Sequence, residues 1–157
     1  MIQRIQTIYL LLAVVLSVAC LCMQIGTFSV DGMAVAREYN LWVMHVDNAP
    51  EHHFSFATVP LFVVLLLSAA LGLYSIFAYR NRITQARFCV FNMLLVVGWY
   101  ILYAVYGFVL IDAGGNPVYF APSFPAALPA VAFVFHLLAR RGIMADERLV
   151  RAADRIR

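Results

Sequence analysis

The sequence has no lysine and few charges of any kind. All eleven basic residues are arginine, and charged residues make up 12% of the 157 positions, whereas soluble domains average about 25%. Hydrophobic residues reach 64%, and the mean hydropathy is +0.87. A soluble fold needs polar side chains over most of its surface, so this composition indicates an integral membrane protein. The net charge is only +3 and no basic soluble domain is present, which excludes a nucleic-acid partner.

Cysteine is also scarce. Cys20 and Cys22 stand near the end of the first apolar run, and Cys89 opens the third. These positions lie at different depths, and a disulfide needs Cα atoms within about 7 Å. We therefore interpret the three cysteines as apolar packing residues.

Four apolar runs are long enough to cross a membrane as helices, and none contains Asp, Glu, Lys or Arg. They cover residues 5–25, 59–79, 88–111 and 119–139. A membrane helix needs about 20 residues, and the alternating segments of a β-barrel are absent. The chain is therefore predicted to be an all-α membrane protein, a single domain over residues 1–157, folded as an antiparallel bundle of four transmembrane helices.

Arginine is distributed unevenly among the connections. Ten of the eleven arginines lie before the first run, between the second and third runs, or after the fourth, and only Arg37 lies in the other two loops. By the positive-inside rule, both termini and the connection from Tyr79 to Arg87 are predicted to be cytoplasmic. The first run partly resembles a lipoprotein signal ending at Cys20, but it continues to Ile25, so we expect it to be retained as an anchor.

The first outer loop, residues 26–58, is predicted to form a small β-hairpin cap. Residues 27–30 and 33–36 flank Asp31 and Gly32, which both accept positive φ in a tight turn. Residues 39–44 are either a third strand or a surface segment with Trp42 in the aromatic belt. Residues 118–120 are a candidate edge strand of the same hairpin.

A group of polar residues later in that loop offers a weak metal-binding hypothesis. Imidazole and carboxylate groups are suitable ligands for a divalent metal, although the spacing matches no known metal motif. The alternative is a solvated acidic loop, and we expect no bound metal. The candidate ligands are His45, Asp47, His52 and His53, with Glu51 beside them.

Each run carries a face of small or polar residues at helical spacing. We expect these faces to meet inside the bundle, because close packing and a few polar contacts hold helices together in lipid. They are Ser17, Cys20 and Gln24; Ser68, Gly72 and Ser75; Asn92, Trp99, Tyr103 and Tyr106; and Pro129 and His136. Asn92, Trp99, Tyr103, Tyr106 and His136 are either interhelical contacts or the lining of a pocket for a flat ligand such as a lipid or a quinone.

Prolines and a glycine predict irregularities in the last helix. Pro122 is expected to open it, and Pro129 is expected to kink it by leaving the carbonyl of Pro125 without a donor. The helix is then expected to end at Gly142 and to restart with the acids that follow.

The tail, residues 140–157, is predicted to form a short amphipathic helix in the cytoplasm. Leu149 and Val150 lie on its apolar face, and Glu147 is placed to pair with Arg151. Arg148, Arg151 and Arg155 are predicted to contact either anionic membrane lipid or a partner protein.

Both ends of the chain resemble a known family. The residues concerned are 1–13, MIQRIQTIYLLLA; 141–143, RGI; Asp146 and Glu147; and 149–157, LVRAADRIR. The chain is similar over its whole length to an uncharacterised family of small four-helix inner-membrane proteins of the Bacteroidetes. The resemblance implies the inner membrane of a Gram-negative bacterium, and it carries over no catalytic or binding residue.

No catalytic motif is present, so we expect neither enzymatic activity nor a cofactor. Our leading hypothesis is an accessory or scaffold subunit that offers its outer cap and its cytoplasmic tail to a membrane-protein partner. The alternative is the binding or transport of a small molecule within the bundle.

Overall fold

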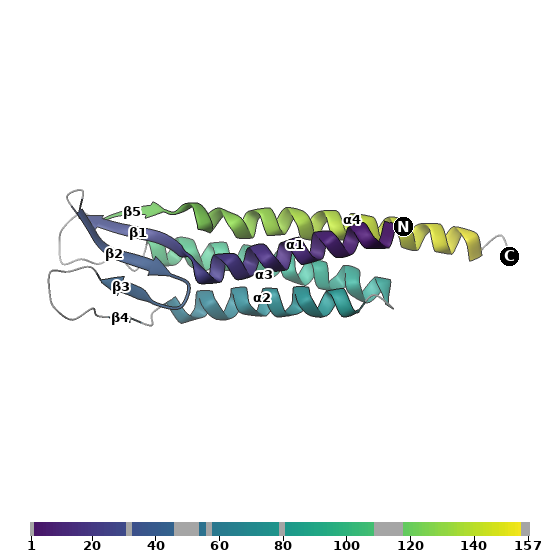
Figure 1. Cartoon of the computed structure of the whole chain (residues 1–157), viewed down its shortest axis with the longest axis horizontal. Coiled ribbons are helices and arrows are strands. Elements are labelled where there is room, and N and C mark those ends of the chain that lie inside the picture. The colour runs from purple at the N-terminus through teal and green to yellow at the C-terminus, as the bar shows by residue number, and fades with distance from the viewer. Residues whose placement is uncertain are drawn as a thin grey trace.

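The computed structural model of the chain describes residues 2–30, 33–45, 54–55, 58–78, 81–108 and 118–154. Over these ranges it contains four helices that are long and apolar enough to cross a membrane. They are α1 (Ile2–Cys22), α2 (Val59–Phe77), α3 (Arg82–Phe108) and α4 (Leu128–Asp154). An antiparallel sheet stands at one end of the helices (Figure 1). The mostly helical fold with a small β cap is therefore confirmed.

The helices form a closed antiparallel bundle. Each packs against the next in chain order, and α4 returns to pack against α1. We call the end that carries the sheet the sheet end. The opposite end, where α4 continues past the start of α1 (Figure 1), is the tail end.

The sheet contains five strands in the order β4-β3-β2-β1-β5. The predicted hairpin is β1 (Gln24–Val30) paired with β2 (Met33–Tyr39), and its turn at residues 31–32 lies outside the described residues. Val118 to Phe120 do form an edge strand, within β5 (Val118–Pro122), which pairs with β1. Residues 39–44 contribute in part to a third strand, β3 (Val43–His45), and β4 (Phe54–Ser55) completes the sheet.

The last helix begins later than predicted. Residues 118–122 are a strand, residues 124–127 form the 3₁₀ turn η2 (Phe124–Ala127), and α4 starts at Leu128. The expected kink at Pro129 was wrong, because Pro129 lies in the first turn of α4, where a backbone N–H has no intrahelical partner to lose. The carbonyl of Pro125 also has a donor, the N–H of Leu128.

The predicted break at Gly142 was also wrong, because α4 continues to Asp154. Packing against α1 outweighs the low helix propensity of glycine. A Cβ atom at Gly142 would lie 3.0 Å from Cγ of Gln6, so the missing side chain lets α1 approach closely. Ile143 and Ala139 are buried beside Leu10 in the same contact.

Helix α3 begins before its apolar run, at Arg82. Its first turns therefore include Arg82 and Arg87, which were predicted to lie in a connection. Gln85 donates to the backbone carbonyl of Ser75 at 3.1 Å, which fastens this polar turn to α2.

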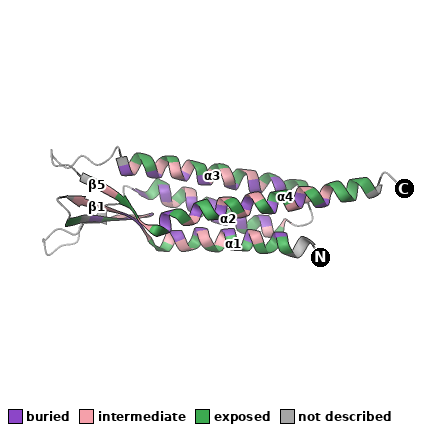
Figure 2. Cartoon of the chain, turned by 90° about the horizontal axis from the view of Figure 1, so that it is seen from above, coloured by how far each residue is buried: buried purple, intermediate pink, exposed green. Residues whose placement is uncertain are grey.

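Most of the predicted inward face is confirmed (Figure 2). Ser17, Cys20, Ser68, Gly72, Ser75, Asn92, Trp99, Tyr103, Pro129 and His136 are buried, while Gln24 and Tyr106 are half-buried. The packing role holds for Cys20 and Cys89 but was wrong for Cys22, which is exposed. Large apolar side chains cover the outside of the helices, as in a bundle that faces lipid.

Two glycines allow a matched test of this packing. At Gly72 a Cβ atom would lie 2.8 Å from Cγ2 of Val14, whereas at Gly98 it would meet nothing within 4 Å. We expect Gly72→Ala to lower the free energy of unfolding by about 1–3 kcal/mol through overpacking. Gly98→Ala should raise it by up to about 1 kcal/mol through helix propensity. Thermal unfolding in detergent measures both, and a Gly72→Ala protein as stable as Gly98→Ala would contradict the close contact of α1 with α2.

Candidate functional site

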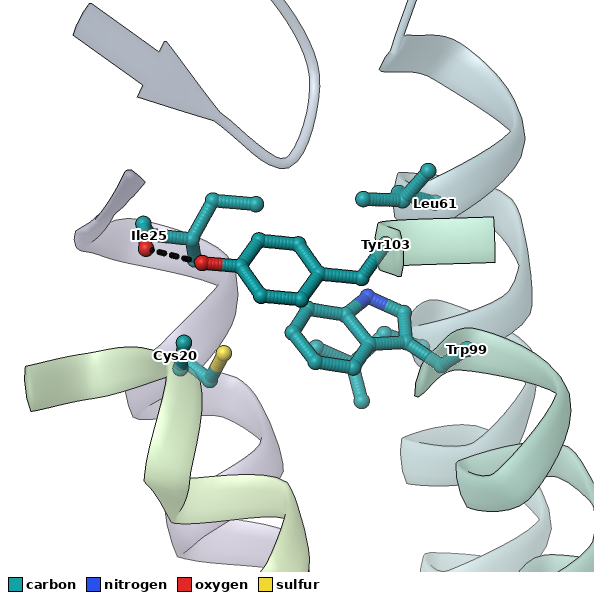
Figure 3. Packing of buried hydrophobic residues seen from close by; sticks show 7 residues of the cluster. Cys20, Ile25, Leu61, Trp99 and Tyr103 are labelled. Carbon is teal, nitrogen blue, oxygen red and sulfur yellow. Dashed lines mark hydrogen bonds between the residues drawn. The ribbon is translucent and has the colours of Figure 1, made fainter. Parts of the chain in front are cut away.

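A chain of hydrogen bonds joins the sheet to the sheet end of the helices. The indole N–H of Trp99 donates to Oδ1 of Asn40 at 3.0 Å, and Nδ2 of Asn40 donates to the carbonyl of Cys20 at 2.7 Å. The Tyr103 hydroxyl donates to the carbonyl of Ile25 at 2.7 Å, as the dashed line in Figure 3 marks. We call these five residues the joint.

The joint is buried and well packed. Trp99 and Asn40 are fully buried. The rings of Trp99 and Tyr103 stack with centroids 5.1 Å apart, and Cys20, Ile25 and Leu61 surround them (Figure 3). Because the indole N–H and the Tyr103 hydroxyl both donate within the protein, the joint satisfies its polar groups internally.

A β-bulge turns Ile25 toward the helices. Gln24 pairs with Tyr39 and Gly26 pairs with Glu38, so Ile25 has no partner in the ladder. Its carbonyl instead accepts the Tyr103 hydroxyl and the N–H of Ser123, the latter at 2.9 Å. One extra residue in β1 thus connects the sheet to α3 and to the start of the last helix.

Glu38 lies buried beside the joint and was not recognised as a functional residue from the sequence. Its side chain is 0% exposed, and neither carboxyl oxygen has a hydrogen-bond partner among the described residues. Burial raises the pKa of Glu38 to about 7, since the charged form is poorly solvated there. The two-residue period of a strand places Glu38 on the same face as Ala36, but it does not show that this face is covered.

A second polar cluster lies deeper in the bundle, where α2, α3 and α4 meet. The Asn92 amide, oriented so that both ends find partners, donates to the carbonyl of Ser68 at 2.8 Å and accepts from the N–H of Gly72 at 3.1 Å. His136 faces the same glycine. It is 1% exposed, and its Nδ1 has no hydrogen-bond partner among the described residues.

The structure therefore divides the predicted pocket residues into two groups. Trp99 and Tyr103 belong to the joint, with Tyr106 packed against the same apolar cluster. Asn92 and His136 belong to the deeper cluster. The hypothesis of one aromatic pocket made by all five residues stays a prediction, and the polar groups of Trp99 and Tyr103 are already occupied by protein.

The tail end has its own polar contacts. Nε2 of Gln6 donates to the Asp146 carboxylate at 2.9 Å, which holds α1 to α4. The predicted pair between Glu147 and Arg151 is present at 3.0 Å. Leu149 and Val150 are exposed, as expected for an apolar face that no other element covers.

Two surface hollows lie near these contacts. One, of about 230 Å³, is lined by Arg140, Arg141, Met144, Ala145 and Arg148, and we call it the arginine hollow. The other, of about 580 Å³, lies between the start of α3 and the end of α4 and is lined by Asn81, Arg82, Ile83, Thr84, Glu147 and Val150.

The metal hypothesis falls on residues that the structure does not describe. Asp47, Glu51, His52 and His53 lie outside the described residues, and His45 is described only in its backbone. Arg155 of the tail also lies outside them. Among the described side chains, no group of three or more His, Cys, Asp or Glu residues is placed to hold a metal ion.

Comparison with protein families places the chain in a family. The family described as "Domain of unknown function (DUF4293)" matches residues 2–156, nearly the whole chain. The chain belongs to this family. A search of curated proteins found no match. The function of this DUF4293 protein therefore has to be argued from its own residues.

The bond between Trp99 and Asn40 can be measured with a double-mutant cycle. We expect Trp99→Phe and Asn40→Ala each to lower the free energy of unfolding by about 1–3 kcal/mol, because each leaves a buried polar group without its partner. The double variant should lose less than the sum of the two. Tyr74→Phe, at an exposed ring, is the control, and additive losses would contradict the bond.

Glu38 makes stability depend on pH in a defined direction. Its pKa is raised from 4.5 to about 7 in the folded protein, so the folded state holds the proton more tightly than the unfolded state. The contribution of Glu38 to stability is therefore largest below about pH 4.5, is lost as the pH rises through about 7, and amounts to about 3 kcal/mol in all. Denaturant titration across this range measures the fall, and Glu38→Gln should flatten it. An equal slope in both proteins would contradict the assignment.

Proposed function

We propose that this DUF4293 chain is a non-enzymatic multi-pass protein of a bacterial inner membrane that acts as an accessory or scaffold subunit. Four helices that can cross a membrane support the insertion. The arginine distribution supports an orientation with both termini in the cytoplasm and the sheet in the periplasm, because ten of the eleven arginines lie before the first apolar run, between the second and third, or after the fourth.

The single observation that carries the scaffold role is the joint. A sheet held to a bundle by buried hydrogen bonds from Trp99, Asn40 and Tyr103 moves with the helices as one body. At the other end, α4 projects beyond α1 (Figure 1). This part of the helix carries the exposed side chains of Arg140, Arg141, Arg148 and Arg151. Two distinct surfaces on one rigid support suit a protein that holds partners on both sides of a membrane.

Co-purification tests this proposal directly. The full chain, tagged at its C-terminus and extracted from its own membranes in mild detergent, should retain a protein partner at a defined ratio in mass spectrometry. Asn40→Ala should release a partner that binds the sheet, because the variant loosens the joint. Tyr74→Phe, at an exposed ring near the tail end of α2, should not. Purification of the chain with no protein partner would count against the scaffold role.

The orientation of the chain in the membrane can be measured separately by cysteine labelling. A cysteine placed at Ser29 in β1 should react with a membrane-impermeant maleimide on intact spheroplasts, whereas one placed at Ala145 in α4 should react only after permeabilisation. Both are introduced into a chain whose three native cysteines are replaced by serine or alanine. The reverse pattern would overturn the orientation.

The tail is proposed to touch anionic membrane or a partner. We expect Arg148→Glu with Arg151→Glu and Arg155→Glu to weaken cross-linking of the tail to its neighbours, because the reversed charges repel anionic lipid. Protease protection of the spans should stay the same. Unchanged cross-linking of the tail would contradict this proposed contact.

A second candidate function, small-molecule binding within the bundle, is favoured by one observation. Nδ1 of His136 is buried without a partner among the described residues and faces the Asn92 cluster. Such a group is costly unless something pairs with it. A lipid, quinone or transported solute with a polar head would supply the missing hydrogen bond.

The second candidate predicts a ligand that travels with the protein. Mass spectrometry of the purified chain should then find a lipid or quinone in stoichiometric amount, and His136→Leu should reduce its occupancy by about tenfold. Val131→Leu, on the exposed side of the same helix, is the control. If His136→Leu raises stability and leaves the occupancy unchanged, the histidine does not bind the ligand.

A further inference from the structure

Three arginines surround a hollow on α4 and have no acidic partner among the described residues. Arg140, Arg141 and Arg148 line the arginine hollow together with Met144 and Ala145, and all three arginines are exposed. The acids next to them are engaged elsewhere. Asp146 is buried against Gln6, and Glu147 pairs with Arg151. The positive charge of the hollow is therefore uncompensated by neighbouring acids.

The position of the hollow along α4 indicates its ligand. The apolar part of the helix ends at the buried Ala139, immediately before Arg140. In a chain inserted as proposed above, the guanidinium groups stand at the level of the phospholipid headgroups. Arginine donates several N–H groups in a planar fork, which suits the oxygens of a phosphate.

We propose that the arginine hollow binds the phosphate group of an anionic phospholipid at the cytoplasmic surface. The proposal rests on the proposed membrane insertion. It goes beyond a general attraction of the tail to anionic lipid, because it names a defined site. It assigns the site to Arg140, Arg141 and Arg148, and it leaves out Arg151, whose charge is paired.

Titration of the delipidated full chain with phosphatidylglycerol, followed by native mass spectrometry, tests the assignment. Arg140→Gln with Arg141→Gln and Arg148→Gln should weaken phosphatidylglycerol binding by about tenfold or more, because each arginine donates a charge-assisted hydrogen bond. The matched control removes the same charge outside the hollow and outside the proposed tail contact, with Arg37→Gln, Arg82→Gln and Arg87→Gln. Equal weakening in the two triple variants would overturn the site.

Two further measurements distinguish a failure of the arginine hollow from a failure of the proposed function. Phosphatidylcholine and inorganic phosphate are titrated in the same way, and strong binding of either in place of phosphatidylglycerol would overturn the anionic-lipid assignment. Protease protection in vesicles reports insertion independently. Loss of protection in the unmodified chain would refute the proposed function, whereas intact protection with no lipid preference would refute only the hollow.

A different observation carries a second inference at the opposite end of the molecule. Glu38 is enclosed where β1, β2 and β5 meet the helices. Its Oε2 would lie 2.9 Å from a Cβ atom at Gly26, and the ring of Phe120 fills the other side of the same position. Phe120 in turn packs edge-on against Tyr103 of the joint, with centroids 5.5 Å apart. A negative charge on Glu38 would have no hydrogen-bond donor among the described residues to stabilise it.

We infer that protonation of Glu38 controls whether the sheet stays packed against the bundle, and we call this device the latch. With its proton, the carboxyl is neutral and the sheet stays seated on α1 and α3. When the proton leaves to the solvent, the carboxylate needs water, and the joint opens to admit it. The Tyr103 hydroxyl on α3 interacts electrostatically with Glu38, and the Cys20 thiol on α1 and the Tyr100 hydroxyl on α3 interact with Tyr103 in turn. Gly26, Phe120 and Val43, the neighbours on β1, β5 and β3, do not titrate.

The emission of Trp99 reports the state of the joint. The chain has two tryptophans, so Trp42→Phe leaves Trp99 alone, bonded to Asn40 and stacked on Tyr103, which interacts with Glu38. From about pH 5.5 to about pH 8, the Trp99 emission should shift to longer wavelength with a midpoint near 7, because opening brings water to the indole. Helix content by circular dichroism should stay constant.

Two variants keep the test decisive. Glu38→Gln resembles the neutral acid and should give short-wavelength emission across the whole range. Glu38→Met, which is apolar and of similar length, should do the same if the amide of glutamine disturbs the site. A pH-dependent shift of equal size in either variant, or a flat response in the chain that retains Glu38, would overturn the latch.

Discussion

The hydrogen bonds from Trp99 to Asn40 and from Asn40 to Cys20 are the contacts on which the rest of the architecture depends. They join residues that are far apart in the sequence, and they lie in a buried core where an unpaired polar group is costly. Together with the bond from Tyr103 to Ile25, they convert a sheet and four helices into one body. Without them the sheet would be held only by its connections and by apolar contacts such as that of Phe120 with Tyr103.

Buried polar groups need partners within the protein, and the two ends of the molecule meet this requirement differently. At the sheet end the polar groups of the joint are satisfied, whereas the Glu38 carboxyl beside it has no partner among the described residues, and burial raises its pKa to about 7. At the tail end Asp146 and Glu147 both have partners: Gln6 donates a hydrogen bond to Asp146, and Arg151 forms an ion pair with Glu147. The arginines that remain face outward, where a phosphate can reach them.

Much of the architecture was predictable because apolar runs and turn residues act locally. The four helices, the hairpin of β1 and β2 and the edge strand β5 all follow from such signals. The failures have a common cause. Gly142 and Pro129 were assigned their usual local effects, but the side chain of Gln6 occupies the space at Gly142, and η2 places Pro129 in a first turn. Glu38 was missed because burial of a carboxyl depends on what covers it.

By itself, the sequence determined the number of helices, their membrane-crossing length and the inward position of small and polar residues, because these properties follow from composition and period. Only the tertiary structure decided which polar groups meet. It brought Asn40, which follows β2, to Trp99 in α3. It also divided the predicted pocket between the joint and the Asn92 cluster, and it left Glu38 and His136 without described partners. Such pairings depend on contacts between distant segments, and no local pattern encodes them.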